Sequence, residues 1–172
     1  NSETESLLRL AYTAQREGDA PVAEIGVEWK ATMAPPDAWK PLVNGAELSS
    51  TDNYRVHIHT QETAYFYVIQ IDTSGQLNWL FPSNSVTAYS SGRNPITPSV
   101  VIELPGNAQA FYLDESVGVE HLYIIASPSR WLELEAVLVT ESRGPAEKNP
   151  IDTPFQLRTR GVAGVRPSDN SE

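Results

Sequence analysis

Residues 65–81 read YFYVIQIDTSGQLNWLF, and this stretch decides the fold. Together with the preceding alanine, residues 64–71 form an apolar run of strand length, which is typical of a strand covered on both faces. Residues 72–75 form a turn in which glycine can adopt a positive φ, and residues 76–81 return as a second strand. The stretch therefore predicts an antiparallel hairpin whose aromatic rings fill a core.

Shorter strands are predicted on both sides of this hairpin. Residues 54–59 alternate between apolar side chains and Arg55, His57 and His59, so this strand is half buried. The other predicted strands are residues 25–29, 100–104, 110–113 and 121–126, with a closing strand within 155–165. Short strands separated by turns at this spacing are typical of a mainly β fold, here an antiparallel, Greek-key-like β-sandwich.

Helices are predicted at both ends of the sandwich. Residues 1–18 have apolar side chains at helical spacing, and a second helix follows residues 127–129, after the last core strand. Its apolar side is predicted to be Trp131, Leu132, Leu134, Val137 and Leu138, with Glu133 and Glu135 off that side. We expect one β-sandwich domain over residues 20–166, followed by a flexible tail over 167–172.

Composition excludes several classes of partner. The 172 residues carry 12 Lys and Arg against 22 Asp and Glu, and the net charge of -10 repels nucleic acid. Because the chain has no cysteine, it forms neither disulfides nor thiolate metal sites. No apolar run approaches the length of a membrane helix.

Several short motifs follow one another along the chain in a recognisable order. They are YFYVI at 65–69, DTSGQ at 72–76, LFPS at 80–83, NP at 94–95, IELP at 102–105, FYLD at 111–114, GVE at 118–120 and IAS at 125–127. With this order, residues 45–138 resemble the bacterial family catalogued as domain of unknown function 4384, and TRGV at 159–162 is similar to the closing segment of its exported members. The resemblance implies an exported or envelope-attached protein, some members being lipoproteins, and it carries over no catalytic residue.

Three histidines are the candidate metal ligands. His57 and His59 lie two residues apart on one strand, which places both imidazoles on the same face. A third ligand would come from His121, with Glu62 or Glu120 as carboxylate alternatives. The other interpretation is two histidines that face solvent, and we predict neither a metal nor any other cofactor.

Nucleophilic catalysis finds little support in the sequence. The chain has no Gly-x-Ser-x-Gly elbow and no Ser-x-x-Lys motif, and its serines cluster in turns. We therefore predict that it is not an enzyme.

The sequence instead favours a structural or protein-binding role in a bacterial cell-envelope or extracellular complex. Long polar loops and exposed aromatic side chains are common at binding surfaces. The predicted contact residues are Trp39 on a proline-rich loop and Asn84, Tyr89, Arg93 and Asn94 in the polar loop 83–98. The alternative is a small-ligand or carbohydrate-binding module that uses Trp29, Trp39 or Trp79 as a stacking platform.

The chain begins at Asn1 rather than at a methionine. Two interpretations fit this start: a processed product from which a signal or lipoprotein leader was removed, or a chain that was trimmed at this point, and both allow a lipid anchor on a removed or upstream amino terminus. The expected location is the periplasm, the outer membrane or the outside of a bacterial cell, and the expected partner is another protein there.

Overall fold

The computed structural model describes residues 21, 23–72, 74–82, 94–106, 108–113, 117–141 and 162–167. The helix predicted for residues 1–18 lies outside this part of the chain, and so does the predicted tail 167–172 except for Pro167, which is the last residue of a strand. Within the described residues, no helix combines the length and the apolar character that a membrane crossing requires.

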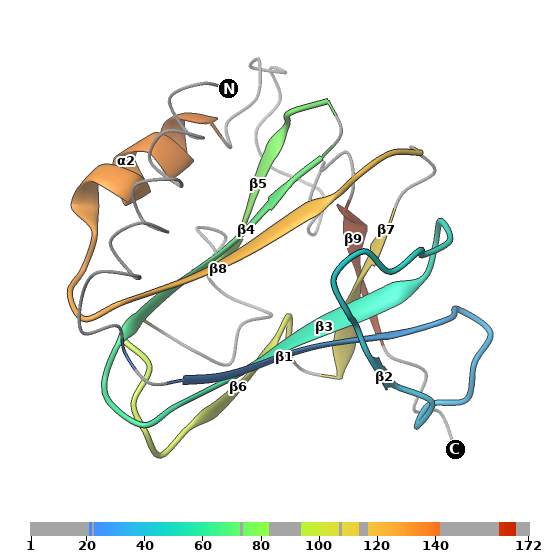
Figure 1. The fold of residues 1–172 in the computed structure, drawn as a ribbon, viewed down its shortest axis with the longest axis horizontal. Coiled ribbons are helices and arrows are strands. Elements are labelled where there is room, and N and C mark those ends of the chain that lie inside the picture. The colour runs from blue at the N-terminus through green and yellow to red at the C-terminus, as the bar shows by residue number, and fades with distance from the viewer. Residues whose placement is uncertain are drawn as a thin grey trace, which may run out of the picture.

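Two antiparallel sheets form the domain (Figure 1). The larger sheet contains β1 (Ala23–Lys30), β2 (Lys40–Pro41), β3 (Asn53–Thr60), β6 (Val101–Leu104), β7 (Gln109–Leu113) and β9 (Val162–Pro167). The smaller sheet contains β5 (Leu77–Phe81), β4 (Tyr65–Ile71) and β8 (His121–Ser127), in that order. The predicted β-rich sandwich is confirmed, and β9 overlaps only the end of the predicted closing strand.

Strand β3 is the centre of the larger sheet. Its whole length pairs with β1, while its other edge pairs with β6 near one end and with β7 near the other. The side chains of Tyr54, Val56 and Ile58 are buried between the sheets, whereas the alternate residues Arg55, His57 and His59 are half buried and Asn53 is buried. The prediction of a half-buried strand is confirmed.

The predicted hairpin is formed by β4 and β5. Asp72 closes its turn, because Oδ1 accepts hydrogen bonds from the backbone and hydroxyl of Ser74 and from the backbone N–H of Gln76. Gly75 has a φ of 79°, a conformation that favours glycine. Phe66 and Phe81 are fully buried in the core between the sheets, as the aromatic pattern predicts.

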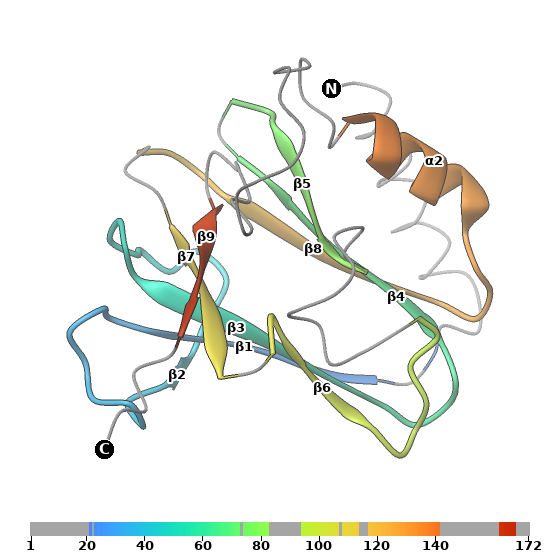
Figure 2. The same ribbon diagram turned by 180° about the vertical axis from the view of Figure 1, so that it is seen from behind.

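Helix α2 (Leu132–Glu141) covers the face of the smaller sheet that points away from the larger sheet (Figures 1 and 2). Leu134 and Leu138 are fully buried there, in one cluster with Tyr67. The predicted helix is confirmed, but its predicted apolar side is wrong at two positions. Leu132 is 60% exposed, whereas the Glu135 side chain is only 16% exposed.

A hydrogen-bonded tyrosine explains why Glu135 points toward the sheet. The Tyr67 hydroxyl donates to Glu135 Oε1 over 3.1 Å and accepts from the Trp131 N–H over 2.9 Å. Arg130 holds the same carboxylate through Nε and Nη2. Burial, with a further contribution from Glu135, raises the pKa of Tyr67 to about 12, so the hydroxyl stays a donor. The start of α2 is therefore tied to β4 by polar contacts as well as by apolar packing.

We predict that Tyr67→Phe lowers the free energy of unfolding by about 1–3 kcal/mol, since Glu135 and the Trp131 N–H lose a partner at a half-buried site. Tyr65→Phe is the matched control, because Tyr65 lies on the same strand and its hydroxyl forms no hydrogen bond among the described residues. Urea unfolding followed by circular dichroism measures both variants. Equal losses in the two would contradict this role of the Tyr67 hydroxyl.

Candidate functional site

The face of the larger sheet that points away from the smaller sheet is called the outer face below. Alternation along β1, β3 and β6 places one set of side chains on it, and the strand register puts them side by side. The set is Glu24, Glu28, Lys30, Asn53, Arg55, His57, His59, Val101 and Glu103. In the described part of the chain, α2 lies on the other sheet, and no helix packs on the outer face.

Four of these side chains form an ionic cluster across three strands. Glu28 Oε2 on β1 lies 2.8 Å from Arg55 Nη2 and 2.9 Å from both Arg55 Nε and His57 Nε2. On the other side of β3, Glu103 Oε2 lies 3.4 Å from Arg55 Nη1 and 3.7 Å from His57 Nδ1. Arg55 and His57 are thus held between two carboxylates.

The electrostatics of Glu28 follow from this geometry. Burial alone raises the pKa of Glu28, but the hydrogen bonds from Arg55 and His57, together with their charges, outweigh it. The net effect is a pKa below the ordinary value of 4.5. The carboxylate is therefore ionised at neutral pH and keeps both partners in place.

Trp39 covers one end of the cluster. It lies between β1 and β2, on the loop where the sequence predicts it, and is half buried. The centre of its ring is 4.2 Å from Arg55 Cζ and 5.2 Å from Lys30 Nζ. The predicted contact residue therefore belongs to the outer face through two cation–π contacts.

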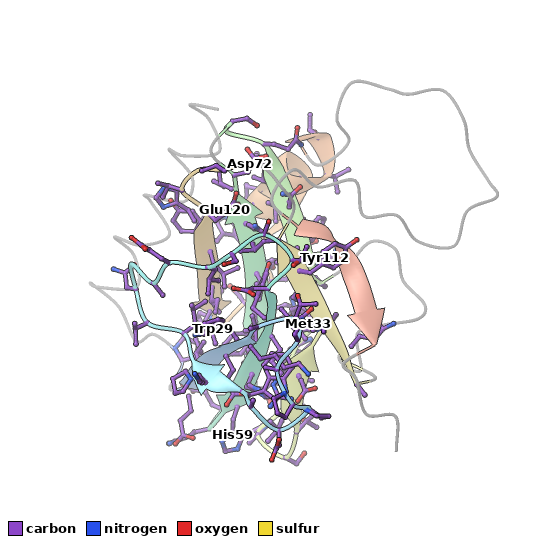
Figure 3. All side chains as sticks on the ribbon, turned by 90° about the vertical axis from the view of Figure 1, so that its right-hand side faces the viewer. Trp29, Met33, His59, Asp72, Tyr112 and Glu120 are labelled. Atoms are coloured by element: carbon purple, nitrogen blue, oxygen red, sulfur yellow. The ribbon has the colours of Figure 1, made fainter. Side chains whose placement is uncertain are left out.

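The three candidate metal ligands are not brought together. His59 Nδ1 lies 3.8 Å from Glu24 Oε2 on the outer face, while the His121 ring stacks on Tyr123 at the start of β8. Figure 3 shows His59 at the opposite end of the molecule from Glu120, the neighbour of His121 in sequence. Among the described residues, no group of three or more His, Asp or Glu side chains could hold a metal ion.

The three tryptophans of the predicted stacking platform lie in different places. Trp29 packs against the core between the sheets, and Trp79 packs on the helix-covered side of the smaller sheet. The Trp79 indole donates to the Phe81 carbonyl over 2.9 Å. Because Trp39 belongs to the outer face, the three rings do not line one surface.

The polar loop is described only at its end. Asn84, Tyr89 and Arg93 lie outside the described residues. Asn94 is half buried, and its amide is bonded to one backbone unit: Oδ1 accepts from the Phe66 N–H, and Nδ2 donates to the Phe66 carbonyl. This contact residue of the prediction therefore fastens the loop to β4.

A buried polar chain joins the sheets on the inner side. The Tyr54 hydroxyl donates to Gln70 Oε1 over 2.9 Å, and Gln70 Nε2 donates to Glu120 Oε2 over 2.8 Å. Burial, reinforced by the Glu120 charge, raises the pKa of Tyr54 well above its ordinary value, so its hydroxyl remains a donor. These contacts satisfy polar groups inside the sandwich and give them a structural role.

The sequence did not predict that Glu28, Arg55 and Glu103 form one cluster. The alternation along residues 54–59 placed Arg55 on the polar face, but strand pairing brings the two carboxylates to it. Lys30 was missed because a lysine at the end of a strand is usually exposed.

Comparison with protein families gives a match. Residues 49–130 match the family described as domain of unknown function (DUF4384), so the resemblance seen in the motifs is confirmed over that range. The comparison with curated proteins gave no match, and neither did the comparison with solved structures.

We predict that Glu28→Gln lowers the free energy of unfolding at pH 7 by about 0.5–1 kcal/mol, because a partly exposed ionic cluster contributes modestly. The folded-state pKa of Glu28 is depressed, so the wild-type advantage is complete above pH 4.5 and shrinks as the pH falls further. Glu24→Gln is the control at an exposed position on the same strand and face. Urea unfolding between pH 3 and 7, about the range that carboxylates titrate in, measures the difference, and a difference that persists at the lowest pH would contradict the assignment.

Proposed function

We propose that this chain, whose residues 49–130 match a family of unknown function, is a non-catalytic protein-interaction domain of a bacterial cell-envelope or extracellular complex, and that it binds its partner through the outer face. The observation that carries the proposal is the ionic cluster of Glu28, Arg55, His57 and Glu103. It joins three strands, is half buried and is flanked by Trp39, on a sheet face that no described helix covers.

The composition of the outer face supports binding to a protein. Tryptophan and arginine carry a large share of the energy at protein interfaces, and here Trp39 stacks over Arg55. The carboxylates on both sides hold Arg55 in one orientation, so less side-chain freedom is lost when a partner arrives. Exposed Val101 and Glu24 give the face a mixed apolar and charged margin.

The same contacts support a role without chemistry. Both ring nitrogens of His57 face carboxylates, at 2.9 Å and 3.7 Å, so neither is directed at a nucleophile. The Arg55 guanidinium is likewise engaged by Glu28 and Glu103. The groups that could transfer a proton or hold an anion are thus occupied with one another.

The location in this proposal rests on the family resemblance, which implies exported members, some with lipid anchors. Asn84, Tyr89 and Arg93 remain predicted contacts of the loop that precedes Asn94. A partner on the outer face is independent of them, since the cluster belongs to β1, β3 and β6.

The absence of cysteine in the chain allows a single reactive thiol to be placed on the outer face. Val101 lies there beside His59, and Val119 lies off this sheet in the segment before β8; the two are equally exposed, at 64% each. We expect Val101→Cys, labelled with a benzophenone photo-cross-linker, to give one covalent adduct of defined mass in extracts of the native cells. The same label at Val119→Cys is expected to give none.

Trp39→Ala in the Val101→Cys background supplies the specificity control. It is expected to weaken the adduct, because the ring that flanks the cluster is removed, while circular dichroism reports an unchanged fold. Equal labelling from the two thiol positions, or labelling from Val119 alone, would overturn the outer face as the binding surface. Mass spectrometry of the adducts gives the readout.

A further inference from the structure

Lys30, the last residue of β1, is buried in an unusual way. The residue is only 2% exposed, and its Nζ has no hydrogen-bond partner among the described residues. An ammonium group that loses its water without gaining an acceptor is strongly unfavourable. Buried lysines in folded proteins are normally paired, so the missing partner calls for a physical reason.

The register shows where this ammonium lies. Lys30 pairs with Asn53 and shares the outer face with Arg55, two residues further along β3. The Trp39 ring lies 5.2 Å from Nζ, and its electron-rich face offsets part of the lost hydration. Lys30 is thus a cation beneath an aromatic cover at the margin of the ionic cluster.

The carboxylates of the cluster do not neutralise Lys30. Glu28, two residues earlier on β1 and on the same face, directs Oε2 to Arg55 and His57. Glu103 lies on β6, on the far side of β3, and faces the same two side chains. The positive charge of Lys30 is therefore left for an acceptor from outside the described part of the domain.

We propose that Lys30, together with the Trp39 cover, is a binding site for a carboxylate group of the partner protein. This inference rests on the proposed function, because it assigns a chemical group to the partner of the outer face. The carboxylate comes from an acidic side chain or from a carboxyl terminus, which share the chemistry that Lys30 recognises. A charge-assisted hydrogen bond from Nζ to this oxygen supplies the acceptor that the domain lacks.

Entry of the carboxylate requires Trp39 to move. The ring belongs to the segment between β1 and β2; β2 pairs with β1 through Lys40 and Pro41, and the Leu42 N–H donates to the Val27 carbonyl just beyond that pair. Met33, in the same segment, is 94% exposed, so this connection lies at the surface. Displacement of the ring exchanges a cation–π contact for an ion pair at a site that is already desolvated.

The test uses short peptides that each present one carboxylate. Acetyl-Ala-Glu-Ala-amide presents a side-chain carboxylate, acetyl-Ala-Ala-Ala with a free carboxyl terminus presents a terminal one, and acetyl-Ala-Gln-Ala-amide presents none. NMR titration of the full chain is followed at the Trp39 indole N–H and at the backbone N–H of Lys30. We expect saturable shifts with at least one of the charged peptides and none with the uncharged peptide, and the stronger charged peptide identifies the source.

Lys30→Met keeps the length of the side chain and removes its charge, and Lys40→Met is the matched control at an exposed lysine of the same region. Lys30→Met is expected to reduce affinity by about tenfold or more, as loss of a charge-assisted hydrogen bond does. Lys40→Met is expected to change it less than about twofold, since exposed charges contribute little. A melting temperature of Lys30→Met at or above that of the wild type would show that the variant is folded.

Two outcomes of the peptide titration would overturn the proposal. One is the absence of saturable shifts with both charged peptides, and the other is equal affinity of the Lys30→Met variant and the wild type. Cross-linking at Val101 decides the proposed function separately. An adduct at Val101 that persists undiminished with Lys30→Met would reject the carboxylate site and keep the binding surface, whereas carboxylate binding without a Val101 adduct would reject the binding surface.

Discussion

The structure depends on one constraint: β3 must bury the side chains of one face in the core and place polar side chains on the opposite face. Its inner side chains, with Val56 and Ile58 at the centre, are fully buried against the smaller sheet, while Arg55 and His57 point to the opposite side. A shift of one residue in its pairing would turn these polar side chains into the core. The same register that buries the core therefore also assembles the ionic cluster, so the candidate site is a direct product of the fold.

The ionic cluster contributes more to order than to stability. Its members are about one quarter to one third exposed, and pairs at that depth add little free energy because water screens them. Apolar burial in two clusters, one between the sheets and one beneath α2, supplies the larger part. Arg55 is nevertheless fixed, because Glu28 and Glu103 hold it from both sides. A fixed charge on an uncovered sheet face favours recognition, since a partner meets one defined pattern of charges.

Sequence reasoning succeeded where a local rule decides the outcome. The hairpin of β4 and β5 follows from an apolar run, a turn and a glycine, and α2 follows from its apolar periodicity. Sequence reasoning failed where the outcome depends on pairing between strands that are far apart in the sequence. The contact between Glu28 and Arg55 joins residues 27 positions apart, and the one between Arg55 and Glu103 joins residues 48 positions apart. A short stretch of sequence cannot predict either strand register. The inward orientation of Glu135 on α2 likewise depends on the hydroxyl of Tyr67, which lies on β4.

Hydrogen bonding distinguishes buried polar groups with a structural role from the one that we assign to binding. Tyr54 and Gln70 lie as deep as Lys30, yet each completes its hydrogen bonds within the domain. Asp72 is also buried and leaves one oxygen unpaired, but its other oxygen accepts three hydrogen bonds that close the hairpin turn. The Lys30 ammonium differs because the aromatic ring of Trp39 replaces a hydrogen-bond acceptor. A methionine would fill the same volume without the desolvation cost, so stability of the isolated domain does not explain a lysine there. Groups that weaken a fold in this way are typical of sites whose partner lies outside it.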